Sequence, residues 1–232
     1  KQKTAYEIAK AEDYIEKVLQ LEAVASKDWL TNKVDRSVTG KVALQQTVGE
    51  IQVPLNNLGV MALDYLSNKG IATSIGHAPV AALIDAGAGS RLSVTESLTN
   101  LVWAPMSEGL KGVSLSANWM WPAKNDGENS RLYQAVKEVS EFTCALGINI
   151  PTGKDSLSMA QKYPDGKKVL APGSVIISAV GEVSNINKIV TPNLKTAPTS
   201  QLIYVPFSNG KLSIGGSSFG QIINSLGGNT PD

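Results

Sequence analysis

The chain has 232 residues, of which 42% are hydrophobic and 18% are charged, as in ordinary globular proteins. Its 21 basic and 20 acidic residues leave a formal net charge of +1, which excludes a long-range field that would gather nucleic acid or an anionic membrane. A single cysteine, Cys144, excludes an internal disulfide framework and a cysteine-rich metal site.

Two further features of the sequence concern the compartment of the protein and the environment of its cysteine. No secretory pattern and no apolar run of membrane-spanning length is present, so we expect a cytoplasmic protein. Cys144 sits in the apolar run 142–146, which predicts a buried and inert thiol.

In the first half of the chain, an apolar stripe predicts an amphipathic helix over residues 6–21. Short apolar runs then predict strands at 38–44, 58–63 and 71–75. A glycine-rich stretch at 87–90 opens a second helix that runs to about Trp103, with Ser90 as its expected N-cap.

The next segment predicts a strand at 113–121 and another long helix. Asn129 or Ser130 is the expected N-cap of this helix, and Gly147 is its expected C-terminal stop. Strands are then predicted at 156–159 and 175–180. A Pro-Asp-Gly turn at 164–166 lies between them and predicts that they pair as a hairpin.

A Pro- and Thr-rich stretch at 191–198 predicts a domain boundary. Beyond it, one strand at 202–205 and one helix at 215–226 are too little to bury a sizeable core. Lys1 stands where Met would be expected in a complete protein, and the chain stops just after this helix. From these features we expect a piece of a longer protein that ends at the opening of a second domain.

Glu96 and Asn100 are four residues apart on the helix after Ser90 and therefore share a face. Their oxygens are hard ligands that suit Mg²⁺. The alternative is an ordinary solvated helix face, and the spacing alone leaves both interpretations open.

Residues 152–159 place Gly153, Lys154 and Ser156 at a strand entrance, where a backbone can approach a phosphate closely and a lysine can neutralise it. A polar turn is the alternative. Asn118 stands among large apolar residues and either orients a ligand or pins a loop. His77, the only histidine, lies in an expected turn without a partner motif for acid–base catalysis.

Six stretches together resemble the formylglycinamide ribonucleotide amidotransferase family in its long, single-chain form. They occur in that family's order and spacing, from about Ala5 to the end of the chain: DRSVTG (35–40), QVPL (52–55), GIATSIG (70–76), RLSVTESLTN (91–100), LSANWM (115–120) and GKDSLSM (153–159).

The resemblance implies an α/β (α+β) fold: a mixed sheet packed with helices, like the N-terminal domain of aminoimidazole ribonucleotide synthetase, followed by the start of a second α/β domain. It divides the chain into a linker helix and connection (1–34), the N-terminal domain of the second synthetase half (35–190) and the truncated start of its C-terminal domain (191–232).

The implied activity is the ATP- and glutamine-dependent conversion of formylglycinamide ribonucleotide to the amidine in purine biosynthesis. The implied cofactors are Mg²⁺ and ATP or ADP. The first synthetase half and a glutaminase domain are the implied partners, so a piece of this length is expected to be inactive alone. The exposed sheet face is expected to be apolar and to pair two copies as a homodimer.

Carried over by position, the resemblance implies that Glu96 and Asn100 ligate Mg²⁺ at a nucleotide site, with Asn57 where the family has an Asp. Asn57 can coordinate through its amide oxygen but brings no charge. Gly153, Lys154 and Ser156 match a stretch that faces the ATP and substrate site, and Asn118 matches a loop near it.

Two other interpretations stay open. One is a non-catalytic scaffold half that pairs sheets and holds a structural nucleotide. The other is a complete small enzyme of the wider ATP-binding superfamily, such as a selenophosphate or thiamine-phosphate enzyme.

Overall fold

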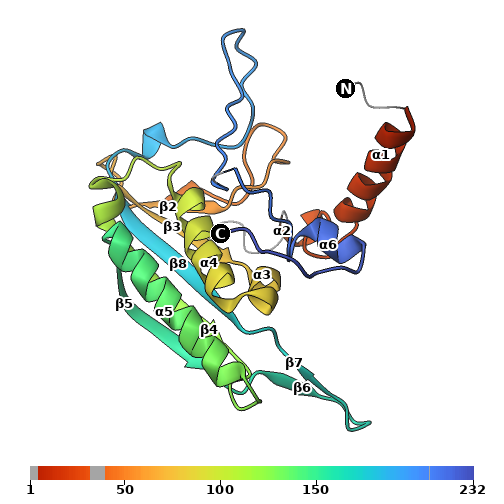
Figure 1. Ribbon diagram of the computed structural model, residues 1–232. Helices are drawn as coiled ribbons and strands as arrows, with labels where there is room; N and C mark the ends of the chain where they lie inside the picture. Colours follow the sequence, from red (N-terminus) through yellow and green to blue (C-terminus); the bar gives the residue numbers. More distant parts are fainter. Residues whose placement is uncertain (1–4, 32–39, 209) are drawn as a thin grey trace.

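The computed structural model describes residues 5–31, 40–208 and 210–232 (Figure 1). The fold is a mixed α/β architecture built on a six-stranded sheet in the order β1-β2-β3-β8-β4-β5. Its strands are β1 (Val42–Leu44), β2 (Leu58–Ala62), β3 (Gly70–His77), β4 (Val113–Met120), β5 (Asn149–Ser156) and β8 (Ser174–Val183).

Neighbouring strands of the sheet run antiparallel except β4 and β5, which are parallel. A parallel pair needs a long crossover connection. Helix α5 (Glu128–Leu146) provides it, and the helix expected before Gly147 is present. Strand β5 shares only Ser156 with the strand expected at 156–159.

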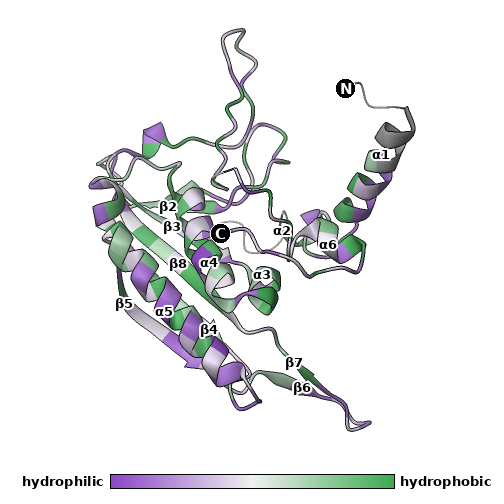
Figure 2. Cartoon of the chain, viewed as in Figure 1, coloured by the Kyte–Doolittle hydropathy of each residue, from purple (hydrophilic) through white to green (hydrophobic). Residues whose placement is uncertain are grey.

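One face of the sheet is covered by helices. Helix α4 (Ala86–Leu101) packs against β3 and β8, α5 packs against α4, and the short α3 (Pro79–Ile84) packs on α4. Along β3 and β8, every second residue is buried under these helices, which is the period expected of a half-covered sheet. Figure 2 shows the result: β8 is largely hydrophobic, while the outer side of α5 is hydrophilic.

The opposite face of the sheet carries no helix. Hydrophobic side chains on it are about half exposed, among them Met61, Ile71, Ile75 and Val180. They alternate with small polar residues such as Thr73 and Ser178, whose side chains are also exposed. This open face is therefore mixed in character, less uniformly apolar than expected.

Helix α4 lies unusually close to β3, because Gly76 has no side chain. A Cβ at this position would lie 2.1 Å from the carbonyl oxygen of Ser93 and 2.4 Å from the backbone nitrogen of Ser97. Beside it, the Ser74 hydroxyl donates a 2.6 Å hydrogen bond to the Ser97 carbonyl. The close contact fixes which α4 side chains reach the end of β3.

The expected N-caps of both long helices were wrong. Helix α4 starts four residues before Ser90, where the Asp85 carboxylate accepts the Ala88 N–H at 2.9 Å; Ser90 is buried inside the helix and donates to the Ala86 carbonyl. Gly127, in the left-handed region at φ 78°, precedes α5 in place of Asn129 or Ser130. Gly147, at φ 70°, ends α5 as predicted.

The expected hairpin of residues 156–159 with 175–180 was also wrong. Strand β5 ends at Ser156, and β8 pairs with β3 and β4 instead. The Pro-Asp-Gly turn is real, but it joins two short strands of a separate two-stranded sheet, β6 (Ala160–Lys162) and β7 (Lys168–Leu170). The Pro-Asp-Gly residues predict the turn correctly, but they do not indicate which strands the turn connects.

The segments flanking the sheet are thinly packed. Helix α1 (Ala5–Leu19) forms as predicted and contacts α6 (Ser218–Ile222) through an edge-to-face pair of Tyr14 and Phe219, whose ring centroids are 5.3 Å apart. Three short helices complete the described elements: α2 (Asp28–Thr31), η1 (Gly109–Gly112) and η2 (Ile186–Lys188).

Three sequence expectations differ in these flanking regions and on α5. The strand expected at 202–205 is absent, because these residues form no ladder hydrogen bonds with another described segment. Of the strand expected at 38–44, only Val42–Leu44 forms; residues 38 and 39 lie outside the described residues. Cys144 is exposed, because it falls on the outer side of α5, away from the buried Thr143. Among the described helices, none is long and apolar enough to span a bilayer.

Candidate nucleotide and metal site

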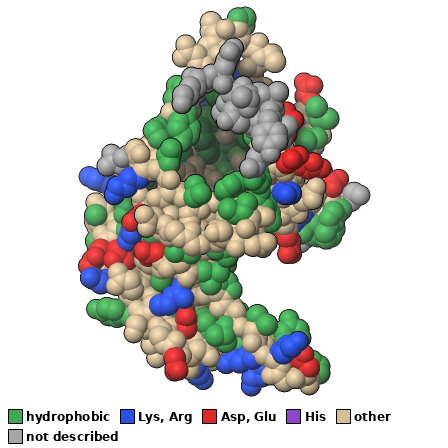
Figure 3. Space-filling model, turned by 45° about the vertical axis from the view of Figure 1, so that its right-hand side comes forward, with side chains coloured by type: hydrophobic (Ala, Val, Ile, Leu, Met, Phe, Trp, Pro, Cys, Tyr) green, Lys and Arg blue, Asp and Glu red, His purple; other side chains and the backbone are tan. Residues whose placement is uncertain are grey.

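A groove of about 1400 Å³ runs across the open face of the sheet. All six strands of the sheet contribute to its lining, and α4 contributes Glu96 and Asn100. Figure 3, a view with the right-hand side of Figure 1 turned forward, shows charges of both signs scattered over the surface and hydrophobic side chains around a hollow. A ligand would therefore be held by local contacts and not by a broad field of one sign.

Glu96 and Asn100 reach the same end of β3, as their spacing predicted. One Glu96 carboxylate oxygen accepts the backbone N–H of His77 at 2.6 Å. The Asn100 side-chain nitrogen donates to the carbonyl of Ile75 at 3.1 Å. In each side chain, one polar atom makes a hydrogen bond that fixes the orientation of the side chain. The remaining oxygen, Oε1 of Glu96 or Oδ1 of Asn100, makes none of the described hydrogen bonds and can contact another partner.

Asn57 lies just before β2, is exposed and lines the same groove as Glu96 and Asn100. The three residues expected at a metal therefore share one surface. Among the described residues, no group of three or more His, Cys, Asp or Glu side chains gathers. The set of Asn57, Glu96 and Asn100 supplies one carboxylate and two amides. Its oxygen atoms are ligands that suit a hard cation such as Mg²⁺. Because the set carries only one negative charge, phosphate oxygens can act as further, negatively charged ligands.

His77 is the last residue of β3, and not part of a turn as expected. Its exposed side chain lines the groove beside Glu96. The contact that the structure gives it is through the backbone N–H, which orients the Glu96 carboxylate. No partner for acid–base catalysis is placed against it by the described hydrogen bonds.

The second predicted set gathers on β4 and β5. Asn118 is the register partner of Lys154, and Gly153 is the partner of Ala117. The Lys154 ammonium donates to the Ser156 hydroxyl at 3.0 Å. A Cβ on Gly153 would lie 2.3 Å from the Ala117 carbonyl oxygen, so the backbones approach here as only glycine permits.

The amide oxygen of Asn118 is buried and has no hydrogen-bond partner in the described part of the chain. A buried acceptor without a donor is uncommon, and it is a point where a ligand or partner N–H would be favourable. Asn118 lies on the strand that was predicted at 113–121, and Gly153, Lys154 and Ser156 lie within β5, so the alternative of a polar turn does not form. They do not line the same hollow as Glu96, so the structure forms two clusters on the sheet.

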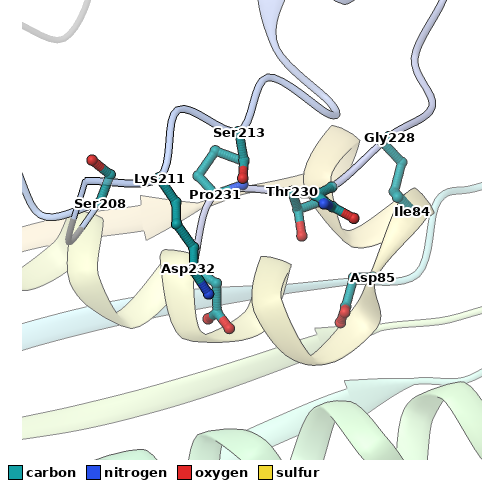
Figure 4. A pocket seen from close by; sticks show the side chains of 10 residues that line it. Ile84, Asp85, Ser208, Lys211, Ser213, Gly228, Thr230, Pro231 and Asp232 are labelled. Carbon is teal, nitrogen blue, oxygen red and sulfur yellow. The ribbon is translucent and has the colours of Figure 1, made fainter.

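Two further hollows were not predicted. One of about 240 Å³ is lined by Trp103 at the end of α4, by the loop before β2 and by residues 190–192. The spacing of Trp103, seven residues after Glu96, is the sequence signal that could have indicated it. The other, of about 380 Å³, lies beside the start of α4, and Figure 4 shows Lys211 and Asp232 extending toward α4 from the C-terminal segment.

The carboxylates of this last hollow have structural partners. Asp85 caps α4, and Asp232 pairs with Arg91, whose Nε lies 2.7 Å from Oδ1. The hydrogen bond from Arg91 to Asp232 is the main cause of the raised pKa of the guanidinium, which therefore stays charged. Arg91 also pairs with Glu138 and so joins α4, α5 and the C-terminal segment. We assign this hollow no ligand.

Comparison with known proteins identifies relatives along nearly the whole chain. Phosphoribosylformylglycinamidine synthase of Homo sapiens is 45% identical over 219 residues, which cover 94% of this chain and 16% of that protein. A probable phosphoribosylformylglycinamidine synthase of Caenorhabditis elegans is 43% identical over 220 residues, covering 94% of this chain and 16% of that protein. The chain thus spans about one sixth of the length of these curated relatives.

Among solved structures, PurLQS from Thermotoga maritima matches 66% of this chain and 23% of that chain, with 18% identity and a TM-score of 0.49. The family model described as the FGAR-AT PurM_N-like domain matches residues 26–182. That match covers more than half of the sequence and includes the six-stranded sheet except for Val183, together with Asn57, Glu96, Asn100 and the β4–β5 cluster. The chain belongs to the FGAR-AT PurM_N-like domain family.

Proposed function

We propose that the chain is a portion of a formylglycinamide ribonucleotide amidotransferase that contributes nucleotide, Mg²⁺ and substrate contacts to de novo purine biosynthesis. The observation that carries the proposal is that Glu96, Asn100 and Asn57 line one groove, while Oε1 of Glu96 and Oδ1 of Asn100 are not used in the described hydrogen bonds. The relatives named as synthases support the reaction class. In this proposal the chain is inactive alone and works in the cytoplasm.

In this function, the three side chains would hold Mg²⁺ against the phosphates of ATP or ADP. The ion would neutralise phosphate charge, which is the main requirement of phosphoryl transfer. The hydrogen bonds of Glu96 to His77 and of Asn100 to Ile75 fix the two side chains before a ligand arrives, so little side-chain entropy would be lost on binding.

The β4–β5 cluster supports a second contact with phosphate or substrate. Lys154 supplies a mobile positive charge, and the close approach at Gly153 leaves the strand surface open for a ligand. The unpaired Asn118 oxygen would accept a hydrogen bond from a substrate N–H or O–H. We propose that these residues face the substrate site of the complete enzyme, with residues 1–34 as linker and 191–232 as the start of the next domain.

Calorimetric titration distinguishes the proposed Mg²⁺–nucleotide site from the scaffold interpretation. Mg-ADP should bind to the purified chain with a measurable heat, and ADP in excess EDTA should bind at least about tenfold more weakly, because the metal bridges protein and phosphate oxygens. Folding is checked by circular dichroism in both buffers. Equal binding with and without metal would contradict the Mg²⁺ site. No binding by the folded chain would contradict a nucleotide site of either kind and would leave sheet pairing as the role of the chain. The small-enzyme alternative is not retained, since the relatives are amidotransferases.

We further propose that the open sheet face pairs with a similar sheet: the first synthetase half in the complete enzyme, or a second copy of this chain in isolation. Static light scattering at micromolar concentration should give twice the chain mass. Val180→Lys, at the centre of this face, should shift the chain to monomer, because two buried ammonium groups would oppose each other. The glutaminase domain would join only in the complete enzyme.

Val169→Lys is the matched control, since Val169 is similarly exposed but lies on β7, outside the open face. It should leave the mass unchanged. A wild-type chain that is strictly monomeric at these concentrations would contradict the homodimer.

A further inference from the structure

Residues 210–232, which we call the strap, lie beside the first turns of α4 and against α3 (Figures 1 and 4). Near its start, the strap backbone touches α3 directly, since a Cβ on Gly216 would lie 2.8 Å from the Cα atom of Ala81. At its other end, the Asp232 carboxylate accepts two hydrogen bonds from the guanidinium of Arg91 on α4, one of them from Nε at 2.7 Å. A hollow of about 380 Å³ lies between the strap and the start of α4, so the two surfaces are not closely packed along their whole length.

The strap is held together by its own hydrogen bonds. The Gly215 N–H donates to the carbonyl of Asn229 at 2.9 Å, and the Gly216 N–H donates to the carbonyl of Leu226 at 3.0 Å. These bonds join the two sides of the strap around helix α6, so the strap can move as one unit. Residues 191–208, which precede it, form no helix or strand and are mostly exposed, as a hinge requires.

Little apolar surface holds the strap on the helices. Two of its hydrophobic side chains, Leu212 and Ile214, remain 89% and 57% exposed. The Asp232 side chain is half exposed, and an ion pair in contact with water contributes little to stability because solvent screens it. The strap therefore belongs to the less stable part of the fold, from which moving segments are drawn.

Arg91 is oriented from its other side by the helical layer. Its guanidinium also pairs with Glu138 on α5, and Gln134 donates a 2.6 Å hydrogen bond to the second oxygen of that carboxylate. Both partners belong to α5 and not to the strap, so Arg91 keeps its orientation when the strap leaves. Asp232 can then return to a guanidinium that is already in place, and the planar fork of the guanidinium is selective for a carboxylate.

We propose that the strap docks reversibly on α3 and α4, and that the pairing of Arg91 with Asp232 is the latch that keeps it closed. The hinge at 191–208 lets the strap swing away, and the hollow beside α4 then opens to solvent. This device needs no nucleotide and goes beyond the proposed function. Where residues 191–232 begin the next domain, as proposed above, the strap would carry that domain toward or away from α4, and only this last consequence rests on the proposed function.

Single-molecule fluorescence energy transfer on the full chain measures the open fraction of the strap. One dye is attached to Cys144, the only cysteine, which is exposed on α5, and the other to Ser225→Cys on the exposed part of the strap. Asp232→Ala should raise the ratio of open to closed molecules roughly three- to fivefold, the upper range for a partly exposed ion pair. Arg91→Met should raise it by the same factor, and the double variant should raise it no further, because both changes remove one interaction.

Asp165→Ala is the matched control, because it removes the same charge from an exposed ion pair, with Lys167 at 3.4 Å, that lies in the β6–β7 turn and not at the strap. Its open fraction should equal that of the wild type. A single, unchanged transfer efficiency in the wild type and in both latch variants would overturn the reversible strap. An open fraction that rises in Asp232→Ala but not in Arg91→Met would overturn Arg91 as the latch.

This test is independent of the calorimetric test of the metal site, since the distance between the dyes is measured without nucleotide or Mg²⁺. Failure of the proposed function and failure of the strap are therefore observed separately. Circular dichroism and the unfolding midpoint establish that each variant is folded.

Discussion

Gly76→Ala is expected to lower the midpoint of thermal unfolding by roughly 5–10 °C. The added Cβ would meet two backbone atoms of α4, the Ser93 oxygen at 2.1 Å and the Ser97 nitrogen at 2.4 Å, and backbone cannot rotate away as a side chain can. Overpacking of a close contact costs about 1–3 kcal/mol or more. For a chain of this size, each kcal/mol lowers the midpoint by about 2–4 °C.

The same substitution should weaken Mg-ADP binding in the folded fraction. To relieve the clash, α4 must move away from β3. Glu96 and Asn100, which belong to α4, move with it, and their hydrogen bonds to the end of β3 are weakened. Differential scanning calorimetry measures the first effect, and titration below the midpoint measures the second.

Gly227→Ala is the control, because a Cβ there meets no atom within 4 Å and its backbone has no positive φ. It should melt within about 2 °C of the wild type, as surface substitutions do. If Gly76→Ala and Gly227→Ala melted alike, α4 could not lie as close to β3 as the structure has it.

The elements that could be predicted from the sequence are those with a strong local signal. The apolar run at 175–180 lies in β8, the long amphipathic pattern before Gly147 lies in α5, and Gly147 itself ends that helix. The start of each helix was less predictable, since Asp85 competes with Ser90 and Gly127 with Asn129, all of them acceptable N-cap residues. Which one caps depends on where tertiary packing starts the helix.

Strand pairing could not be predicted, because it joins distant segments. The partners of β8 are β3, about a hundred residues earlier, and β4, and no local pattern of residues 174–183 identifies either. The turn at 164–166 suggested a nearer partner, and the true hairpin is the small β6–β7 sheet beside it. Residues 202–205 have the composition of a strand, but an extended run forms a strand only when it pairs with a neighbouring strand.

The candidate site also has one part that the sequence predicts and another part that depends on tertiary packing. The shared face of Glu96 and Asn100 follows from helix geometry, so their meeting on one groove could be predicted. Their hydrogen bonds to His77 and Ile75 could not, because they depend on how α4 lies on β3. Trp103 was missed because the residues that complete its pocket, 190–192, come from the far side of the domain in sequence.

The charge of the three-residue set should govern metal-nucleotide affinity. Asn57→Asp is expected to tighten Mg-ADP binding by roughly tenfold, or about 1.4 kcal/mol, because it adds a second carboxylate to a site with one. Glu96→Gln should weaken binding by at least that factor. The amide oxygen of Gln can still accept the His77 N–H, so the variant removes charge while keeping the contact that orients the side chain.

Asn129→Asp is the matched control for charge, because it adds the same carboxylate to the exposed first turn of α5, which does not line the groove. Its Mg-ADP affinity should equal that of the wild type, whereas Asn57→Asp should differ from it by about tenfold. If both variants bound alike, Asn57 would not face the metal. If Glu96→Gln bound as tightly as the wild type, the metal would lie elsewhere. An increase at position 57 together with a loss at position 96 would place the ion between the loop before β2 and α4, in the groove that both residues line.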